Sequence, residues 1–225
     1  MEPAEAAESI RESAAHEKAE YETVERFRTR AAIIIGVLAA LLAIASVGGE
    51  DATKEMLSAN IRAADAWAFY QAKNIRQTSL RLAADDLEAM QLVQGPGLSE
   101  PARLDIERKV ARYKATADRY ENEPDPRDPT NPLKGEGKTQ LLAQAQNFEH
   151  IRDHAERKDR NFDFARGLYQ IALVLGSVSI VATSRRLLVI TLVLGAVATV
   201  LALNGFFLLF DLPGTQAVIG AEGGH

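Results

Sequence analysis

The chain has 225 residues, carries a net charge of −5 and contains no cysteine. An acidic chain lacks the basic face of a nucleic-acid binder, so no nucleic-acid partner is expected. Without cysteine, disulfides, thiolate metal sites and cysteine nucleophiles are excluded. The residues are 47% hydrophobic and 25% charged, a soluble-looking average, but the apolar ones are gathered into three blocks. This segregation predicts an all-α membrane protein with three transmembrane helices.

Residues 1–30 form an acidic amino-terminal segment that holds eight glutamates and is expected to be helical. Residues 31–49 follow as nineteen uncharged residues, which is about the length that a helix needs to cross a bilayer. Ala43 and Ala45 also suit a signal-peptide cleavage site, but a secretory leader begins with a short basic stretch. We therefore interpret residues 31–49 as the first membrane anchor.

Residues 50–166 hold 19 Lys+Arg and 21 Asp+Glu and are predicted to be a long extramembrane helical segment. Apolar positions alternate steps of four and three in two stripes: Leu57, Ile61, Ala64, Ala68, Gln71, Ile75, Thr78 and Leu82; then Ile106, Val110, Tyr113, Ala117 and Tyr120. This is the spacing of a coiled coil. A helix of such length cannot bury a stripe alone, so its partners are helices of the same chain or of neighbouring chains.

Helix-breaking residues divide this segment into a helical hairpin. Gly95-Pro96-Gly97 ends the first helix, and Ser99 offers an N-cap for the second. Residues 121–132 contain half of the prolines and are predicted to be an exposed loop. A third helix begins near Lys138 and leads toward the second span.

Two further apolar blocks close the chain. Residues 167–184 are the more polar of the two, and residues 187–210 are twenty-four residues without a charge. Only Arg185 and Arg186 separate them, so we expect a tight helical hairpin with these arginines in its turn. Residues 211–225 are expected to be a flexible carboxyl-terminal tail.

Basic residues beside the spans predict the orientation, because cytoplasmic loops are enriched in Lys and Arg. The topology determinants are Arg26, Arg28, Arg30, Arg185 and Arg186. They place the amino terminus and the hairpin turn in the cytoplasm, with residues 50–166 and the tail in the periplasm. A second basic cluster lies on the predicted outer side: Arg157, Lys158, Arg160 and Arg166. Loops longer than about 60 residues translocate largely regardless of charge, so the orientation stands.

An aromatic cluster at residues 67–73 includes the only tryptophan. Trp67, Tyr70, Gln71 and Asn74 share one helix face, which we predict to be an interaction face. Packing between helices or subunits is the favoured interpretation, and a ligand pocket is the alternative.

Gln170 and Asn204 are the polar residues that we expect to make contacts inside the membrane, where polar groups usually face protein. An oligomeric channel lined by this pair is a more remote option. The spans contain no charged residue or histidine, which disfavours a proton relay or an ion-coupled pump.

Candidate metal ligands are sparse. His150 and His154 have the i, i+4 spacing that presents two imidazoles to one metal, but no third ligand is identifiable. Acidic residues of the proline-rich loop match no calcium-loop spacing: Glu121, Glu123, Asp125 and Asp128. No phosphate loop, serine triad or paired-carboxylate site is found. We therefore predict no catalytic residues, no metal and no cofactor, and a protein that is not an enzyme.

Two stretches resemble a bacterial family without an assigned activity, the domain-of-unknown-function family 4337. One is Asn60-Ile61-Arg62-Ala63-Ala64-Asp65-Ala66-Trp67-Ala68-Phe69-Tyr70-Gln71-Ala72-Lys73-Asn74-Ile75. The other is the closing hairpin, from Phe164 to Leu173, through Arg185-Arg186 to Gly195 and Gly205-Phe206-Phe207. The resemblance covers most of residues 30–210 and implies a three-span protein of the bacterial inner membrane. Where it leads us to expect histidines before the second span, this chain has Arg160-Asn161-Phe162-Asp163.

The absence of chemistry and the long stripes favour a structural, assembly or accessory protein of the inner membrane. Its partners would be the lipid bilayer, further copies of itself or another membrane protein. The alternative is a membrane-anchored sensor or ligand-binding module with a pocket near the aromatic cluster.

Overall fold

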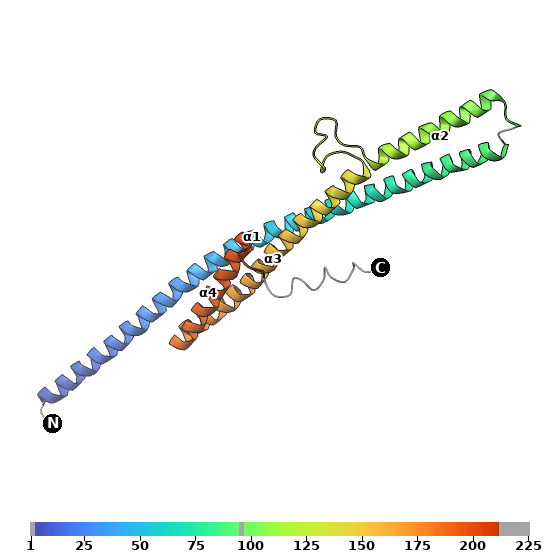
Figure 1. The fold of residues 1–225 in the computed structure, drawn as a ribbon. Helices are drawn as coiled ribbons and strands as arrows, with labels where there is room; N and C mark the ends of the chain where they lie inside the picture. Colours follow the sequence, from blue (N-terminus) through green and yellow to red (C-terminus); the bar gives the residue numbers. More distant parts are fainter. Residues whose placement is uncertain (1–2, 95–96, 212–225) are drawn as a thin grey trace. The chain divides into compact units, whose positions relative to one another are not determined.

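A computed structural model describes residues 3–94 and 97–211 of the chain and contains four helices (Figure 1). They are α1 (Pro3–Gln94), α2 (Glu100–Glu121), α3 (Lys138–Val181) and α4 (Arg185–Phe207). No strand occurs among the described residues, which confirms the predicted all-helical class. Helices α1, α3 and α4 are each long and apolar enough to cross a membrane. The chain divides into two compact units: unit 1 is Met1–Thr53 with Ala155–His225, and unit 2 is Lys54–His154.

Helix α1 runs without a break from Pro3, through the described part of the predicted segment 1–30 and through residues 31–49, to Gln94. Of the predicted break, Gly95 and Pro96 lie outside the described residues. Helix α2 starts after Ser99, which takes the N-cap position as predicted, although its side chain makes no capping hydrogen bond. Helix α3 begins at Lys138, also as predicted, and continues through the second apolar block.

In unit 1, the apolar parts of α1, α3 and α4 lie side by side (Figure 1). Their shared core is made mostly of small residues: Leu38, Ala45, Ala52, Phe162, Ala165, Tyr169, Ala172, Ala198 and Ala202. Alanine and glycine let helix backbones approach closely. The ring of Phe162 fills the space left by two glycines, because a Cβ at Gly48 or at Gly205 would lie 2.7 or 2.9 Å from it.

The turn between α3 and α4 is formed by residues 182–184 and not by the predicted arginine pair. Thr183 adopts a positive φ of 50°, which reverses the chain, and the amide of Ser184 donates to the carbonyl of Ser179 at 3.1 Å. Arg185 and Arg186 are therefore the first residues of α4. The backbone can turn on three small residues, so the charged pair is free to start the next helix.

Helix α4 ends at Phe207, three residues before the predicted end of the third span. Leu208 has a φ of 47°, and its amide donates to the carbonyl of Asn204 at 2.8 Å. The Asn204 side chain accepts a hydrogen bond from the amide of Phe210 at 3.0 Å and so holds the reversed chain. Asp211 is the last described residue and pairs with Arg157 at 3.3 Å. The rest of the predicted tail lies outside the described residues.

In unit 2, one face of α1 forms a seam against the chain's own helices. These seam positions are buried or half-buried and alternate steps of four and three: Ala59, Ala63, Ala66, Tyr70, Lys73, Gln77, Leu80, Ala84 and Leu87. The predicted stripe of α2 is buried or half-buried as well, and its Ile106 and Val110 form a core cluster with Ala84. The predicted stripe of α2 therefore packs within the chain.

The predicted first stripe lies on a different face from this seam. All eight positions, from Leu57 to Leu82, are exposed, so the stripe does not pack within the chain. Each stripe residue comes two positions before a seam residue, which is about 200° around a helix of 3.6 residues per turn. We call these eight residues the α1 stripe: Leu57, Ile61, Ala64, Ala68, Gln71, Ile75, Thr78 and Leu82.

Candidate functional site

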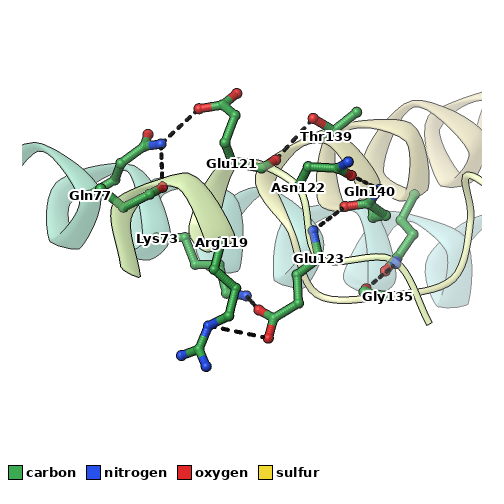
Figure 2. A network of polar contacts seen from close by, with 11 residues as sticks. Lys73, Gln77, Arg119, Glu121, Asn122, Glu123, Gly135, Thr139 and Gln140 are labelled. Carbon is green, nitrogen blue, oxygen red and sulfur yellow. Dashed lines mark hydrogen bonds and ion pairs between the residues drawn. The ribbon is translucent and has the colours of Figure 1, made fainter. Parts of the chain in front are cut away.

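A network of polar contacts lies in unit 2, where the loop between α2 and α3 closes on itself (Figure 2). The amide of Glu136 donates to the carbonyl of Glu123 at 2.9 Å, and Pro124 pairs with Gly135 as an isolated bridge. Gly135 has a φ of +116°, and a Cβ there would lie 2.4 Å from the Glu123 carbonyl oxygen. Only glycine suits that position. The predicted proline-rich loop therefore connects α2 to α3 with its two ends held together by backbone hydrogen bonds.

Side chains from the start of α3 fasten both ends of this loop (Figure 2). The Thr139 hydroxyl donates to the carbonyl of Glu121 at 3.0 Å. Gln140 donates to the Asn122 side chain at 2.6 Å and accepts from the amide of Glu123 at 3.2 Å. These bonds satisfy backbone and amide groups at the end of α2 that the helix itself leaves open.

We call the contacts between the end of α2 and the start of α3 the polar junction. Two lysines connect this junction to α1 and α3. Lys73 of α1 pairs with Glu123 at 2.9 Å, and its ammonium lies 5.4 Å from the centre of the Tyr120 ring. Lys138 of α3 pairs with Glu121 at 3.4 Å, and its ammonium lies 5.5 Å from the centre of the Tyr70 ring. Each lysine thus has a carboxylate and an aromatic face as partners.

Gln77 is the centre of the junction and is only 1% exposed. Its amide donates to the Ala117 carbonyl at 2.9 Å and to Glu121 at 2.8 Å, and its oxygen accepts from Lys138 at 2.9 Å. One side chain of α1 therefore bonds both α2 and α3. A buried network with all its polar groups paired fixes a unique arrangement of helices.

Acidification is expected to loosen this junction. The hydrogen bond from Gln77 and the charge of Lys138 lower the pKa of Glu121 below its ordinary value of 4.5. A carboxylate with a lowered pKa stabilises the fold at higher pH, and this stability is lost as the pH falls through the folded pKa. The thermal midpoint of unit 2, followed by Trp67 fluorescence, should therefore drop below about pH 4.5.

Glu121→Gln tests the assignment, since it removes this titration. The variant should show a shallower acid-side loss than the parent chain, because Asp105 and Asp128, whose pKa values are also lowered by lysine partners, still contribute. Equal acid profiles of parent and variant would contradict a role for Glu121.

The structure places the predicted aromatic face partly inside the chain. The Trp67 indole donates to Glu149 of α3 at 2.9 Å, and its ring meets Tyr70 edge-on at 5.7 Å between centroids. Trp67 and Tyr70 are half-buried, whereas Gln71 and Asn74 are exposed, and Gln71 belongs to the α1 stripe. The four residues therefore divide between the intrachain seam and the free face.

The two polar residues expected inside the membrane have different environments. Asn204 is fully buried, and its amide donates to Asn161 at 2.8 Å and to the carbonyl of Phe210 at 2.9 Å. Gln170 is exposed on the surface of unit 1, one turn after Arg166. Asn204 is thus committed to intrachain bonds, so it cannot line a channel together with Gln170.

The predicted topology arginines are all exposed, and three of them line one groove of unit 1: Arg26, Arg30 and Arg185. Arg28 and Arg186 do not line it. Arg26 also has Glu22 within 3.5 Å on the same helix, with both side chains more than half exposed. The five arginines were predicted to act alike as topology determinants, but only three of them lie at this groove.

The model of a family described as Domain of unknown function (DUF4337) matches residues 27–208. The chain belongs to this family. No curated protein and no solved structure matches the chain. The DUF4337 match contains residues 31–49 and 167–184, all of α4, the α1 stripe and the polar junction.

The candidate metal ligands of this DUF4337 chain either bond other side chains or do not gather at one point. His150 and His154 are exposed, and the neighbouring carboxylates of Glu149 and Asp153 bond Trp67 and Arg152. Within the described residues, no three histidine or acidic side chains gather as a metal site would require. In the loop, Asp128 is held by Lys134 at 3.0 Å.

Proposed function

We propose that this DUF4337 protein is a non-enzymatic structural or assembly component of the bacterial inner membrane. In this proposal α1 is both an anchor and an oligomerisation helix, and the α1 stripe is the contact with a second copy of the chain. The supporting observation is that all eight stripe positions are exposed while the opposite seam is filled by α2 and α3.

The composition of the stripe suits a helix partner. Its four large aliphatic side chains are between 52% and 67% exposed: Leu57, Ile61, Ile75 and Leu82. They are spaced so that a second helix with the same pattern would interdigitate with them over four turns or more. Burying such side chains is worth about 1.5–3 kcal/mol each. Gln71 and Thr78 lie between them and would set the register of the two helices, as polar residues at a coiled-coil interface do.

The proposed topology determines how two copies would meet. Residues 31–49, 167–184 and 187–210 would cross the membrane, with the amino terminus cytoplasmic and residues 50–166 periplasmic. The same basic residues orient every copy, so neighbouring α1 helices would run parallel. A parallel pair brings each stripe residue against its own counterpart.

A native-mass measurement tests this function. The full chain is extracted from its own membrane in mild detergent, and every component is identified. A multiple of the 24.5 kDa chain is expected, and Ile61→Glu with Ile75→Glu should convert it to the single chain, because four charges would face one another in each pair.

The matched control places two glutamates elsewhere on unit 2. Leu104 of α2 and Leu133 of the loop are also exposed aliphatic residues, and Leu104→Glu with Leu133→Glu should leave the mass unchanged. Dissociation in both double variants would contradict the stripe as the interface. A second protein at fixed stoichiometry would instead make this chain an accessory subunit.

The alternative of a ligand-binding module receives less support. Trp67 and Tyr70 already contact Glu149 and Lys138 of the same chain, so packing accounts for the aromatic cluster. Saturable quenching of the single tryptophan by a small molecule would favour that alternative.

A further inference from the structure

A groove of about 520 Å³ opens in unit 1 between α1 and the first two turns of α4. Its polar part is formed by Arg26 and Arg30 of α1 and Arg185 of α4. Its apolar part includes Phe27 of α1 and Leu188 and Leu192 of α4. The groove therefore combines a cationic site with a greasy wall.

The positive charge of this groove is poorly compensated. Neither Arg30 nor Arg185 forms an ion pair with any residue that the structure describes, and Arg26 has only the exposed Glu22. The first turn of α4 contains no acidic residue, and Ser184 makes no capping bond with its side chain. A helix amino terminus carries partial positive charge, so it adds to the field of the three guanidinium groups.

Along the groove, basic residues are followed by apolar ones, as the headgroup of a lipid is followed by its acyl chains. Arg26 and Arg30 are one turn apart on α1, and Leu188 and Leu192 are successive turns of the α4 face that starts near Arg185. Arg30 directly precedes residues 31–49, and Arg185 precedes residues 187–210. The basic part thus lies at the ends of two span-length stretches, and the apolar part lies within the second.

We propose that this groove binds the headgroup of one anionic phospholipid, with its phosphate held by Arg30 and Arg185 and an acyl chain along Leu188 and Leu192. Guanidinium groups recognise phosphate oxygens through paired hydrogen bonds, and basic pockets at the cytoplasmic ends of membrane helices bind lipid headgroups. The proposal rests on the membrane insertion proposed above. Arg30 and Arg185, predicted as topology determinants, would then also bind one lipid at a defined site.

The test uses the full chain in nanodiscs made of equal parts phosphatidylcholine and phosphatidylglycerol. After transfer to mild detergent, native mass spectrometry counts the phosphatidylglycerol molecules retained by each chain. The parent is expected to retain one, and Arg30→Gln with Arg185→Gln should weaken retention about tenfold or more. Arg28→Gln with Arg186→Gln removes the same charge beside the groove and should retain the lipid like the parent.

Equal loss in both double variants would overturn the proposal, since general charge attraction would then explain the binding. Retention in the groove variant would overturn it too. Competition with millimolar inorganic phosphate separates the two sources of the anion. Resistance to phosphate supports a lipid that also uses the apolar wall, and full displacement would show a site for free phosphate instead.

A flotation control distinguishes this inference from the proposed function. Every variant is reconstituted in vesicles and centrifuged in alkaline carbonate. A chain that does not float with the vesicles contradicts membrane insertion itself. A chain that floats but retains phosphatidylglycerol no better than phosphatidylcholine contradicts only the groove.

Discussion

Replacing Phe162 with alanine is expected to destabilise unit 1 by about 3–5 kcal/mol, the usual cost of truncating a buried phenylalanine. The side chain is 2% exposed and stacks edge-on against Phe206 at 4.8 Å between ring centres. It also fills the space above Gly48 and Gly205, so three helices lose contacts together. Unfolding in dodecyl sulfate, followed by far-ultraviolet circular dichroism, measures the change.

Phe164→Ala is the matched control for this experiment. Phe164 lies two residues further along α3 and is 56% exposed, so its truncation creates no cavity. The control should unfold like the parent chain. Comparable destabilisation by both substitutions would contradict the packing of α1, α3 and α4 around Phe162.

Replacing Lys138 with methionine should have the largest effect on unit 2. Methionine keeps much of the length but removes the ammonium, which leaves the buried oxygen of Gln77 without its donor and Glu121 without its nearest cation. An unpaired buried acceptor costs about 1–3 kcal/mol. The loss appears as an earlier transition in Trp67 fluorescence, because Trp67 is the only tryptophan and lies in the same unit.

Lys134→Met is the control for the junction. Lys134 pairs with Asp128 at 3.0 Å on the loop, but its side chain is 53% exposed. Solvent and salt weaken exposed ion pairs, so this variant should lose clearly less stability than Lys138→Met. If the two variants lost the same stability, the buried network would not hold α1, α2 and α3 together.

Helix content was predictable from the sequence because periodicity and breakers act locally. The starts of α2 and α3 follow from Ser99 and Lys138, and the α2 stripe is buried as its spacing predicts. The ends of the closing hairpin were not predictable. Thr183 and Leu208 adopt positive φ values that their side chains do not signal.

The face of α1 that packs within the chain could not be chosen from hydrophobicity. Two faces have the same 4-3 spacing, and the face with leucine and isoleucine looks more like a core. The structure instead buries the face with alanines and Gln77, since small side chains permit close helix approach and the polar groups find partners. Which lysine and which glutamate would meet depends on loop closure at Gly135, which spacing along one helix does not encode.

Cysteine cross-linking tests most directly whether the α1 stripe joins copies of this membrane-anchored chain. The chain has no cysteine, so each variant carries a single one. Ala64 lies on the stripe and Asp65 lies about 100° around the helix, although both are exposed. A disulfide needs Cα atoms about 4.4–6.8 Å apart, and interface positions of a parallel helix pair lie within that distance of their counterparts. In native membranes under mild oxidation, we expect Ala64→Cys to form a covalent dimer and Asp65→Cys to remain largely a single chain. Absence of the dimer at Ala64, or equal dimer at both positions, would contradict the claim.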